Sequence, residues 1–259
     1  MNDAVEKVQH WLRAAQQVVA LTGAGISTES GIADFRGPDG VWTRNPEAEK
    51  LAAIDTYLAD PEVRRRAWRR RLENAWQPLP NAGHHALVAL ERQGRLHTLI
   101  TQNVDGLHLE AGTSPQRLIE IHGSLRQVSC LDCGIRSPMA AVLERVRAGE
   151  ADPPCLDCGG ILKSATVSFG QRLDRKDLSR AERAARSCDL LLAIGSTLSV
   201  LPVAGIVPLA RQSGARVIII NAEPTAMDAM ANVVIRGPIG AVLPWLVAGV
   251  AEPESRSVH

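Results

Sequence analysis

Short apolar segments that alternate with amphipathic ones are the feature that most restricts the fold of this 259-residue chain. The apolar segments are rich in Val, Leu and Ile, and the stretches between them have the 3.6-residue periodicity of helices. The expected strands are 18–21, 96–101, 118–121, 165–169, 190–194, 217–220 and 233–235, and the expected helices are 5–15, 86–92, 178–186, 203–212 and 242–250. Such alternation predicts an α/β fold, in which helices cover both faces of a doubly wound parallel sheet.

Two segments interrupt the alternation. Residues 32–80 are rich in Arg, Trp and Pro and predict a helical insert, whereas residues 124–162 contain four paired cysteines. We therefore expect a large part built from about residues 1–31, 81–123 and 163–250, and a small part built from the two inserts.

The charge of the chain is nearly balanced, with 29 Lys and Arg against 28 Asp and Glu. No global field therefore favours nucleic acid or an anionic membrane as a partner. The first residues lack the apolar run of a secretory signal, and no stretch approaches the length that spans a bilayer. We expect a cytoplasmic protein with no membrane partner.

Four of the five cysteines form two Cys-x-x-Cys pairs. Cys130 and Cys133 are separated from Cys155 and Cys158 by 21 residues, a spacing typical of a tetrahedral zinc site. Four thiolates leave no coordination position for water, so we expect the zinc to be structural. Cys188 stands alone before an apolar run, which predicts a buried thiol.

A glycine-rich segment, 22–27, follows the first expected strand and should open a helix, where backbone amides can bind a pyrophosphate. It is half of a dinucleotide fingerprint, because Thr28 stands where the third glycine would fall, and a simple tight turn is the alternative.

Further along, Asp34, Phe35 and Arg36 lie between glycines. They predict a lid whose guanidinium pairs with phosphate and whose ring excludes water. A surface turn with one buried Phe is the alternative.

Polar side chains follow two more expected strands, at the carboxyl ends where open α/β sheets bind ligands. Gln102, Asn103 and Asp105 follow 96–101 and suit ribose hydroxyls and a carboxamide, although Asn and Asp near glycine are also ordinary turn formers. His122 ends 118–121 and is the best candidate for a general base, because imidazole titrates near neutral pH. Solvated or core roles are expected for His84, His85, His97 and His259.

Six arginines surround Trp68 in residues 64–71, on an expected helix. Such a cluster can indicate nucleic-acid binding. In a chain of nearly balanced charge a solvated helix face is the favoured interpretation, and a nucleic-acid partner is not expected.

In order and spacing, seven features make the chain resemble the sirtuins, a family of NAD-dependent protein lysine deacylases. They are GAGIS (23–27), GIADFRG (31–37), TQNVDGLH (101–108), His122-Gly123, the four cysteines, GSTL (195–198) and NAE (221–223), and the likeness covers roughly residues 13–248. The resemblance implies one catalytic domain, residues 1–259, with a Rossmann-like sheet, a small zinc module and a helical insert.

The same resemblance implies NAD as co-substrate, one structural zinc ion and acylated lysine on protein substrates. The products would be nicotinamide, O-acyl-ADP-ribose and free lysine, and we expect a monomer. Mono-ADP-ribosyl transfer or NAD hydrolysis is the enzymatic alternative, and an NAD-sensing interaction module is the non-enzymatic one.

Site residues also follow from the resemblance. His122 would be the catalytic base, assisted by Asn103. The cofactor-binding residues would be Gly23, Ala24, Gly25, Ser27, Asp34, Phe35, Arg36, Gln102, Asn103, Val104, Asp105, Gly195, Ser196, Thr197, Asn221, Ala222, Glu223 and Ile239. The substrate-binding residues would be Trp68, Arg71, Phe169, Gly170 and Val200.

The chain departs from the family pattern at several positions. Ala33 and Ser164 stand where Pro is usual, Ser196-Thr197 reverses the usual order, and Gln171 replaces an acid at the expected peptide groove. Family members that remove succinyl or malonyl groups have Tyr and Arg three residues apart; neither Trp68 with Arg71 nor Ala67 with Arg70 supplies the Tyr. We therefore predict deacetylation, with acidic or longer acyl groups as secondary substrates.

Overall fold

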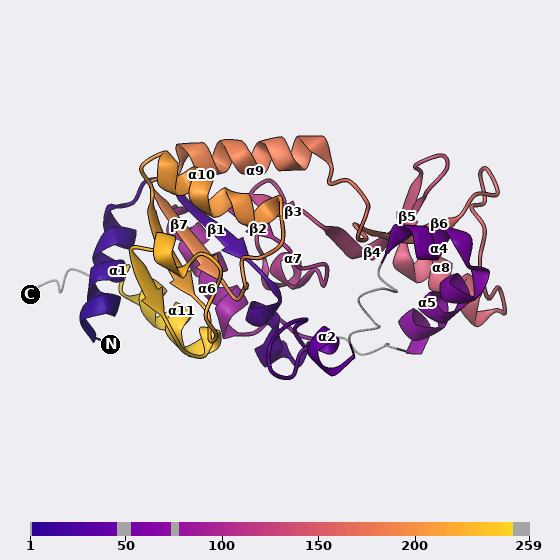
Figure 1. The fold of residues 1–259 in the computed structure, drawn as a ribbon, viewed down its shortest axis with the longest axis horizontal. Coiled ribbons are helices and arrows are strands. Elements are labelled where there is room, and N and C mark those ends of the chain that lie inside the picture. Colours follow the sequence, from indigo (N-terminus) through magenta and orange to yellow (C-terminus); the bar gives the residue numbers. More distant parts are fainter. Residues whose placement is uncertain (1, 46–52, 74–77, 251–259) are drawn as a thin grey trace, which may run out of the picture.

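The computed structural model describes residues 2–45, 53–73 and 78–250, and it shows two parts of different construction (Figure 1). The large part is a six-stranded parallel sheet in the order β3-β2-β1-β7-β8-β9. Its strands are β1 (Val18–Thr22), β2 (Leu96–Thr101), β3 (Leu118–Glu120), β7 (Leu190–Ile194), β8 (Arg216–Ile220) and β9 (Val233–Ile235). By rank along the chain this order is 3-2-1-4-5-6, the Rossmann arrangement, which reverses between β1 and β7. The predicted fold class is confirmed.

Both faces of this sheet are buried. On one face, Val18 and Ala20 pack in a core with α1 (Asn2–Ala14), α6 (Ala82–Arg92) and α11 (Ile239–Ala248). On the other, Val19 and Leu21 pack with α9 (Arg175–Ser187) and α10 (Ile206–Gln212). Because β1 is buried on both faces, its first four residues, Val18 to Leu21, are all apolar and do not alternate with polar residues.

Short helices lie in the segments that connect the strands and longer helices of the large part. They are η1 (Ala24–Ser30), α2 (Val41–Arg44), α7 (Leu107–Ala111), η2 (Val203–Gly205) and η3 (Asp228–Met230). The segment after β1 opens η1, a 3-10 helix rather than an α-helix. Among the helices of the described ranges, none is long and apolar enough to cross a bilayer.

The small part is a three-stranded antiparallel sheet packed against helices. Its strands are β4 (Gly123–Cys130), β5 (Arg136–Pro138) and β6 (Leu162–Thr166), and its helices are α4 (Ile54–Ala59), α5 (Pro61–Glu73) and α8 (Met139–Arg147). Trp68 of α5, Val128 of β4 and Val142 of α8 share one small core. The two inserts therefore pack on each other.

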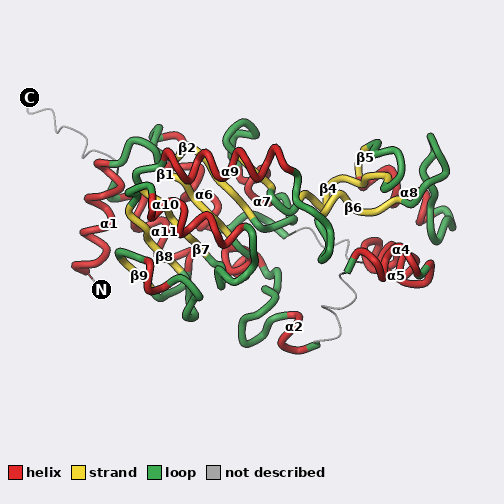
Figure 2. Tube along the Cα trace, turned by 45° about the horizontal axis from the view of Figure 1, so that its top comes forward, coloured by secondary structure: helices red, strands yellow, loops and turns green. Residues whose placement is uncertain are grey.

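The expectation of a parallel-sheet strand at 165–169 is wrong. The observed strand, β6, begins at Leu162 and pairs antiparallel with β4, Ser164 lying opposite Val128. Its first three residues are buried in the small part. The apolar residues Val167 and Phe169, which suggested a strand, lie instead in the loop that returns to α9 (Figure 2). The expected boundary at residue 163 thus falls inside β6.

The chain passes between the two parts directly after His122. Gly123 has a φ of +76°, and a Cβ there would lie 2.0 Å from the Ala165 carbonyl oxygen. Val167, the residue directly after β6, donates its amide to the His122 carbonyl at 2.8 Å. Only glycine allows β4 and β6 to approach so closely at this crossing.

Candidate active site

Two glycine loops meet where the strand order reverses. Gly25 donates its amide to the Gly195 carbonyl at 2.8 Å, which joins the loop after β1 to the loop after β7. A Cβ on Gly23 would lie 2.7 Å from the Gly195 oxygen, and one on Gly195, whose φ is +62°, would lie 2.4 Å from the Ile26 nitrogen. These glycines are therefore required by loop-to-loop packing, a reason that the sequence analysis did not identify.

A cleft of about 2350 Å³ opens at this point and extends between the two parts. All of the predicted catalytic and cofactor-binding residues line it. Of the predicted substrate residues, Arg71, Phe169, Gly170 and Val200 line it as well. Trp68 does not join them, because α5 turns this ring into the core of the small part, where it is 1% exposed.

A hydrogen-bonded network fixes three predicted side chains in the cleft. The Asn103 side-chain amide donates to Ser27 Oγ at 3.1 Å, and Ser27 Oγ donates to Asp105 Oδ2 at 2.8 Å. Asp105 Oδ1 in turn accepts from the Leu107 amide at 2.9 Å. Asn103 and Ser27 are buried, so the network presents preorganised donors and acceptors rather than mobile surface groups.

Two histidines lie behind this network. His84 Nδ1 accepts from the Asn81 amide, so Nε2 carries the proton that faces Ser27 Oγ at 3.5 Å. The His108 ring lies 4.8 Å from that of His84, and its Nε2 lies 3.0 Å from Thr22 Oγ1. Burial lowers the pKa of His84 to about 4 and that of His108 to about 3, so both are neutral at pH 7.

The expected core role of His84 is confirmed, whereas its contact with the site residue Ser27 was missed in the sequence analysis. Asn81, three residues before His84, was the available sequence signal for the position of this histidine. Asn81 is the N-cap of α6 and forms a capping box with His84.

His122 is held in a single tautomer. Its Nδ1 lies 2.9 Å from the Gln102 carbonyl oxygen, which can only accept, so Nδ1 carries the proton and Nε2 the lone pair. Burial lowers the pKa of His122, and the bond to the Gln102 carbonyl acts in the opposite direction. A neutral imidazole with a basic Nε2 at the cleft is the form that a general base requires.

The expected lid, Asp34 to Arg36, is a turn with an aromatic contact. Asp34 Oδ1 accepts from the Gly37 amide at 2.9 Å and closes the turn. The Phe35 ring is 43% exposed, which excludes the alternative of a buried Phe, and its centroid lies 4.6 Å from that of Trp42. Trp42, missed by the sequence analysis, lies 5.5 Å from Phe169 and so connects the lid to the loop after β6.

Cationic side chains line the small-part end of the cleft. Arg71 donates to Ser164 Oγ at 2.7 Å, and burial lowers the pKa of this guanidinium. Burial, together with the charge of Arg71, lowers the pKa of Lys163 to about 8. Tyr57 of α4 lines the same end of the cleft and donates its hydroxyl to the Leu162 carbonyl at 2.8 Å.

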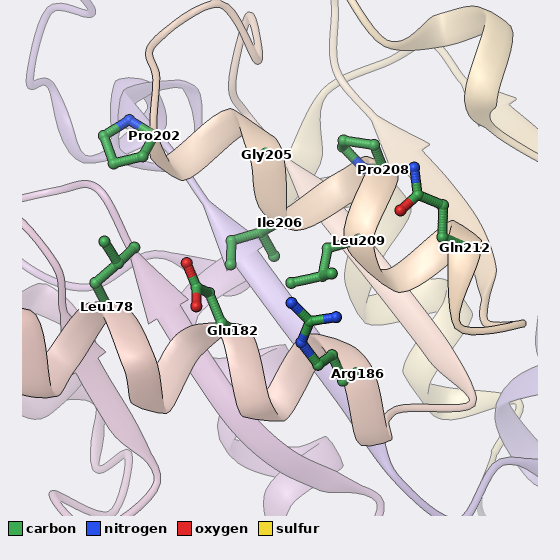
Figure 3. Close-up of a pocket in the computed structure, with 9 residues that line it drawn as sticks. All are labelled: Leu178, Glu182, Arg186, Pro202, Gly205, Ile206, Pro208, Leu209 and Gln212. Carbon is green, nitrogen blue, oxygen red and sulfur yellow. The ribbon is translucent and has the colours of Figure 1, made fainter.

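A smaller pocket of about 260 Å³ lies between α9 and α10 (Figure 3). Glu182 and Arg186 of α9 lie there beside Ile206 and Leu209 of α10. None of the predicted site residues lines this pocket.

The four paired cysteines converge at the far end of the small part. Their sulfur atoms all lie within 4.8 Å of one another. Cys130 Sγ is 3.5 Å from Cys158 Sγ, and Cys133 Sγ is 3.8 Å from Cys155 Sγ. Tetrahedral zinc with bonds of about 2.3 Å places its sulfurs about 3.8 Å apart, so the group fits one zinc ion with all positions filled by thiolate.

A cleft at the reversal point of a doubly wound sheet, with a neutral imidazole at its wall, defines a nucleotide-binding enzyme that carries a separate structural metal site. A model described as the Sir2 family matches residues 23–202, and the chain belongs to that family. The resemblance to the sirtuins is thereby confirmed.

Named relatives match over almost the whole chain. An NAD-dependent protein deacetylase 2 of Streptomyces coelicolor is 51% identical over 234 residues, which are 90% of this chain and 97% of the relative. An NAD-dependent protein deacetylase 1 of Bradyrhizobium diazoefficiens is 41% identical, over 94% of this chain and 95% of the relative.

Solved structures of Sir2 proteins are also similar to this chain over almost its whole length. A Sir2 protein with deacetylated p53 peptide and 3'-O-acetyl ADP ribose has a TM-score of 0.87 at 29% identity, over 95% of this chain and 99% of the other. A Sir2 homolog–NAD complex has a TM-score of 0.83 at 37% identity, over 95% of this chain and 93% of the other.

Proposed function

We propose that this chain is an NAD-dependent protein lysine deacetylase that forms nicotinamide, O-acetyl-ADP-ribose and free lysine. The observation that carries the proposal is that the neutral His122 and the Ser27–Asn103–Asp105 network line one cleft at the reversal point of the sheet. The deacetylase names of the relatives support it independently.

The residues at the reversal point suit NAD. The glycine loop at 23–25 and the Arg36 guanidinium line the side for its diphosphate, and residues 195–197, 221–223 and Ile239 line the side for its adenosine. Gln102 to Asp105 provide amide and carboxylate groups for the nicotinamide and its ribose. NAD, when bound, supplies a ribose carbon that accepts the acyl oxygen as nicotinamide leaves.

Within this site the protein holds and moves protons. Asn103 and Asp105 orient ribose hydroxyls, since their own positions are fixed through Ser27. His122 Nε2 accepts a proton from a ribose hydroxyl, and the Gln102 carbonyl stabilises the imidazolium through Nδ1. Phe35 and Trp42 cover the cleft from the lid side and exclude water.

The acyl-lysine enters between the two parts, beside Phe169, Gly170 and Val200. Trp68 affects this site through the placement of α5 and not by touching the acyl group. The position of Arg71 and Lys163 at the small-part end of the cleft supports an acyl group with an acidic end as the secondary substrate. The cysteines hold zinc as a structural ion. We also propose a monomeric, cytoplasmic enzyme, testable by analytical sedimentation and by cell fractionation.

The test is mass spectrometry of an acetyl-lysine peptide with and without NAD. We expect NAD-dependent loss of the acetyl group, slowed in His122→Ala by about 10²–10⁴-fold because the base is removed. His97→Ala, which changes an exposed histidine on β2, is the matched control and should retain full activity. Absence of NAD-dependent deacetylation by the wild-type protein would refute the proposal.

The acyl preference is tested with acetylated and succinylated peptides of the same sequence. We expect Arg71→Ala to lower succinyl turnover more than acetyl turnover. An unchanged preference in both Arg70→Ala and Arg71→Ala variants would exclude a role of these arginines in recognising the acyl group.

A further inference from the structure

The arginine run of α5 divides into two groups in the structure. Arg64 pairs with Asp152 at 2.8 Å and Arg65 pairs with Glu62, so these two have local counter-charges. Arg66, Arg69 and Arg70 are exposed and line the cleft. Their spacing of three and four residues places them on one helix face. Within 2–45, 53–73 and 78–250, no carboxylate forms an ion pair with any of the three.

A second arginine group lies on the loop after β6 and on the first residue of α9. Arg172 and Arg175 are exposed and line the same cleft. The Ile54 amide donates to the Phe169 carbonyl at 2.9 Å, which attaches this loop to the start of α4. The bond from Arg71 to Ser164 attaches the end of α5 to β6. The two arginine groups are therefore held on segments that border the same cleft, near the proposed acyl-lysine entrance.

Acidic side chains are scarce on these two segments. Glu73 is the single carboxylate of α5 and the 167–175 loop that lines the cleft. Asp174 is used locally, because its carboxylate accepts from the Lys176 and Asp177 amides and caps α9. Gln171 is neutral, and its side-chain oxygen accepts from the Ser168 amide at 3.0 Å. The five exposed arginines thus form a local positive rim in a chain whose formal net charge is only +1.

We infer that this arginine rim selects acyl-lysines that lie in acidic segments of protein substrates. Asp and Glu side chains that flank the modified lysine pair with Arg66, Arg69 and Arg70 on one side and with Arg172 and Arg175 on the other. The inference rests on the proposed function, because it assumes that an acyl-lysine enters between these segments. A polypeptide is the occupant that fits, since the five arginines border the proposed acyl-lysine entrance of a chain whose formal net charge is only +1.

Three acetyl-lysine peptides that differ only at flanking positions, with Glu, Gln or Lys, test the inference. Exposed ion pairs act mainly on association, so we expect the Glu peptide to have a KM about tenfold below that of the Lys peptide at low salt, with similar kcat. The ratio should shrink at high salt because the rim is exposed to solvent. In an Arg69→Glu/Arg70→Glu variant, which leaves three arginines against two added carboxylates, the preference should be largely lost.

Arg183→Glu is the matched control, because Arg183 is exposed on α9 and does not line the cleft. Equal KM for all three peptides, or an equal effect of the control, overturns the inference. If a single-stranded oligonucleotide competes with peptide binding and the protein shows no preference among the three peptides, the inference is overturned in favour of nucleic acid. Measuring peptide binding by fluorescence anisotropy separates this inference from the proposed deacetylase function. If the protein lacks turnover but still binds the Glu peptide with the lowest Kd, only the deacetylase function is refuted. If the three peptides have equal Kd values, the inference is overturned.

Discussion

The two parts of the molecule are stabilised by different means. In the large part, apolar side chains from both faces of the sheet are buried in two extensive cores, and strands such as β1 and β7 are buried throughout. Among the described residues, the hydrophobic cluster shared by the helices and strands of the small part comprises seven buried residues, two of which are the metal-site cysteines Cys130 and Cys155. A core this small does not stabilise a fold alone, so we expect the small part to depend on zinc and the large part to fold without it.

The largest effect should follow removal of the metal. Structural zinc contributes about 10–16 kcal/mol in isolated zinc modules, so Cys155→Ser or chelation should unfold β4 to β6 and leave the parallel sheet folded. Hydrogen exchange measured by mass spectrometry should show lost protection in 123–166 and retained protection in β1 and β7.

Cys188→Ser is the control for that experiment, because Cys188 is buried in the large part and lies away from the metal group. Stoichiometric zinc in a Cys155→Ser protein that folds normally would contradict the four-cysteine assignment.

A smaller effect, confined to the large part, should come from acid. The folded pKa values of His84 and His108, about 4 and about 3, lie below the 6.5 of an ordinary histidine. Their contribution to stability is therefore complete above pH 6.5 and is lost as the pH falls towards 4 and 3. With two protons taken up on unfolding, the free energy of unfolding should fall by up to about 2.7 kcal/mol per pH unit.

Urea denaturation between pH 7 and pH 4.5 measures this slope. His108→Gln should reduce it by about half, whereas His97→Gln, on the exposed side of β2, should leave it unchanged. An identical slope in the His108→Gln protein would show that these histidines do not control acid stability.

The smallest effect concerns thiol chemistry and leaves the large part folded. Burial raises the pKa of Cys188 to about 12, so this thiol should resist alkylation in the folded large part. In metal-free protein, where β4 to β6 are expected to unfold, the four paired cysteines should react before Cys188. Peptide mapping after iodoacetamide treatment checks the order, and early labelling of Cys188 would show that the large part also opens when zinc is lost.

Sequence patterns predicted the large part better than the small one. Apolar strands such as 190–194 are recognisable because burial on both faces excludes polar residues from them. Strand β6 was misplaced because its buried residues include Lys163 and Ser164, whose position depends on pairing with β4 and not on an apolar run.

The site shows the same limit. Gln102, Asn103, Asp105 and His122 were identifiable because each follows an expected strand end. Contacts between distant segments could not be predicted from the sequence. One is the packing of Gly23 on Gly195. Another is the division of the arginine run, since Arg64 pairs with Asp152 on another segment.

Gly123 has a consequence for how such enzymes diversify. The chain leaves the large part at Gly123 and returns at Thr166, and these two residues are paired with each other. The stretch between them therefore begins and ends at one point of the large part, and its other contacts include those with α5 of the helical insert. Its length and surface can change during evolution without shifting β3 or the imidazole that precedes the junction. Substrate preference can therefore diverge among relatives while the NAD-consuming chemistry is inherited intact.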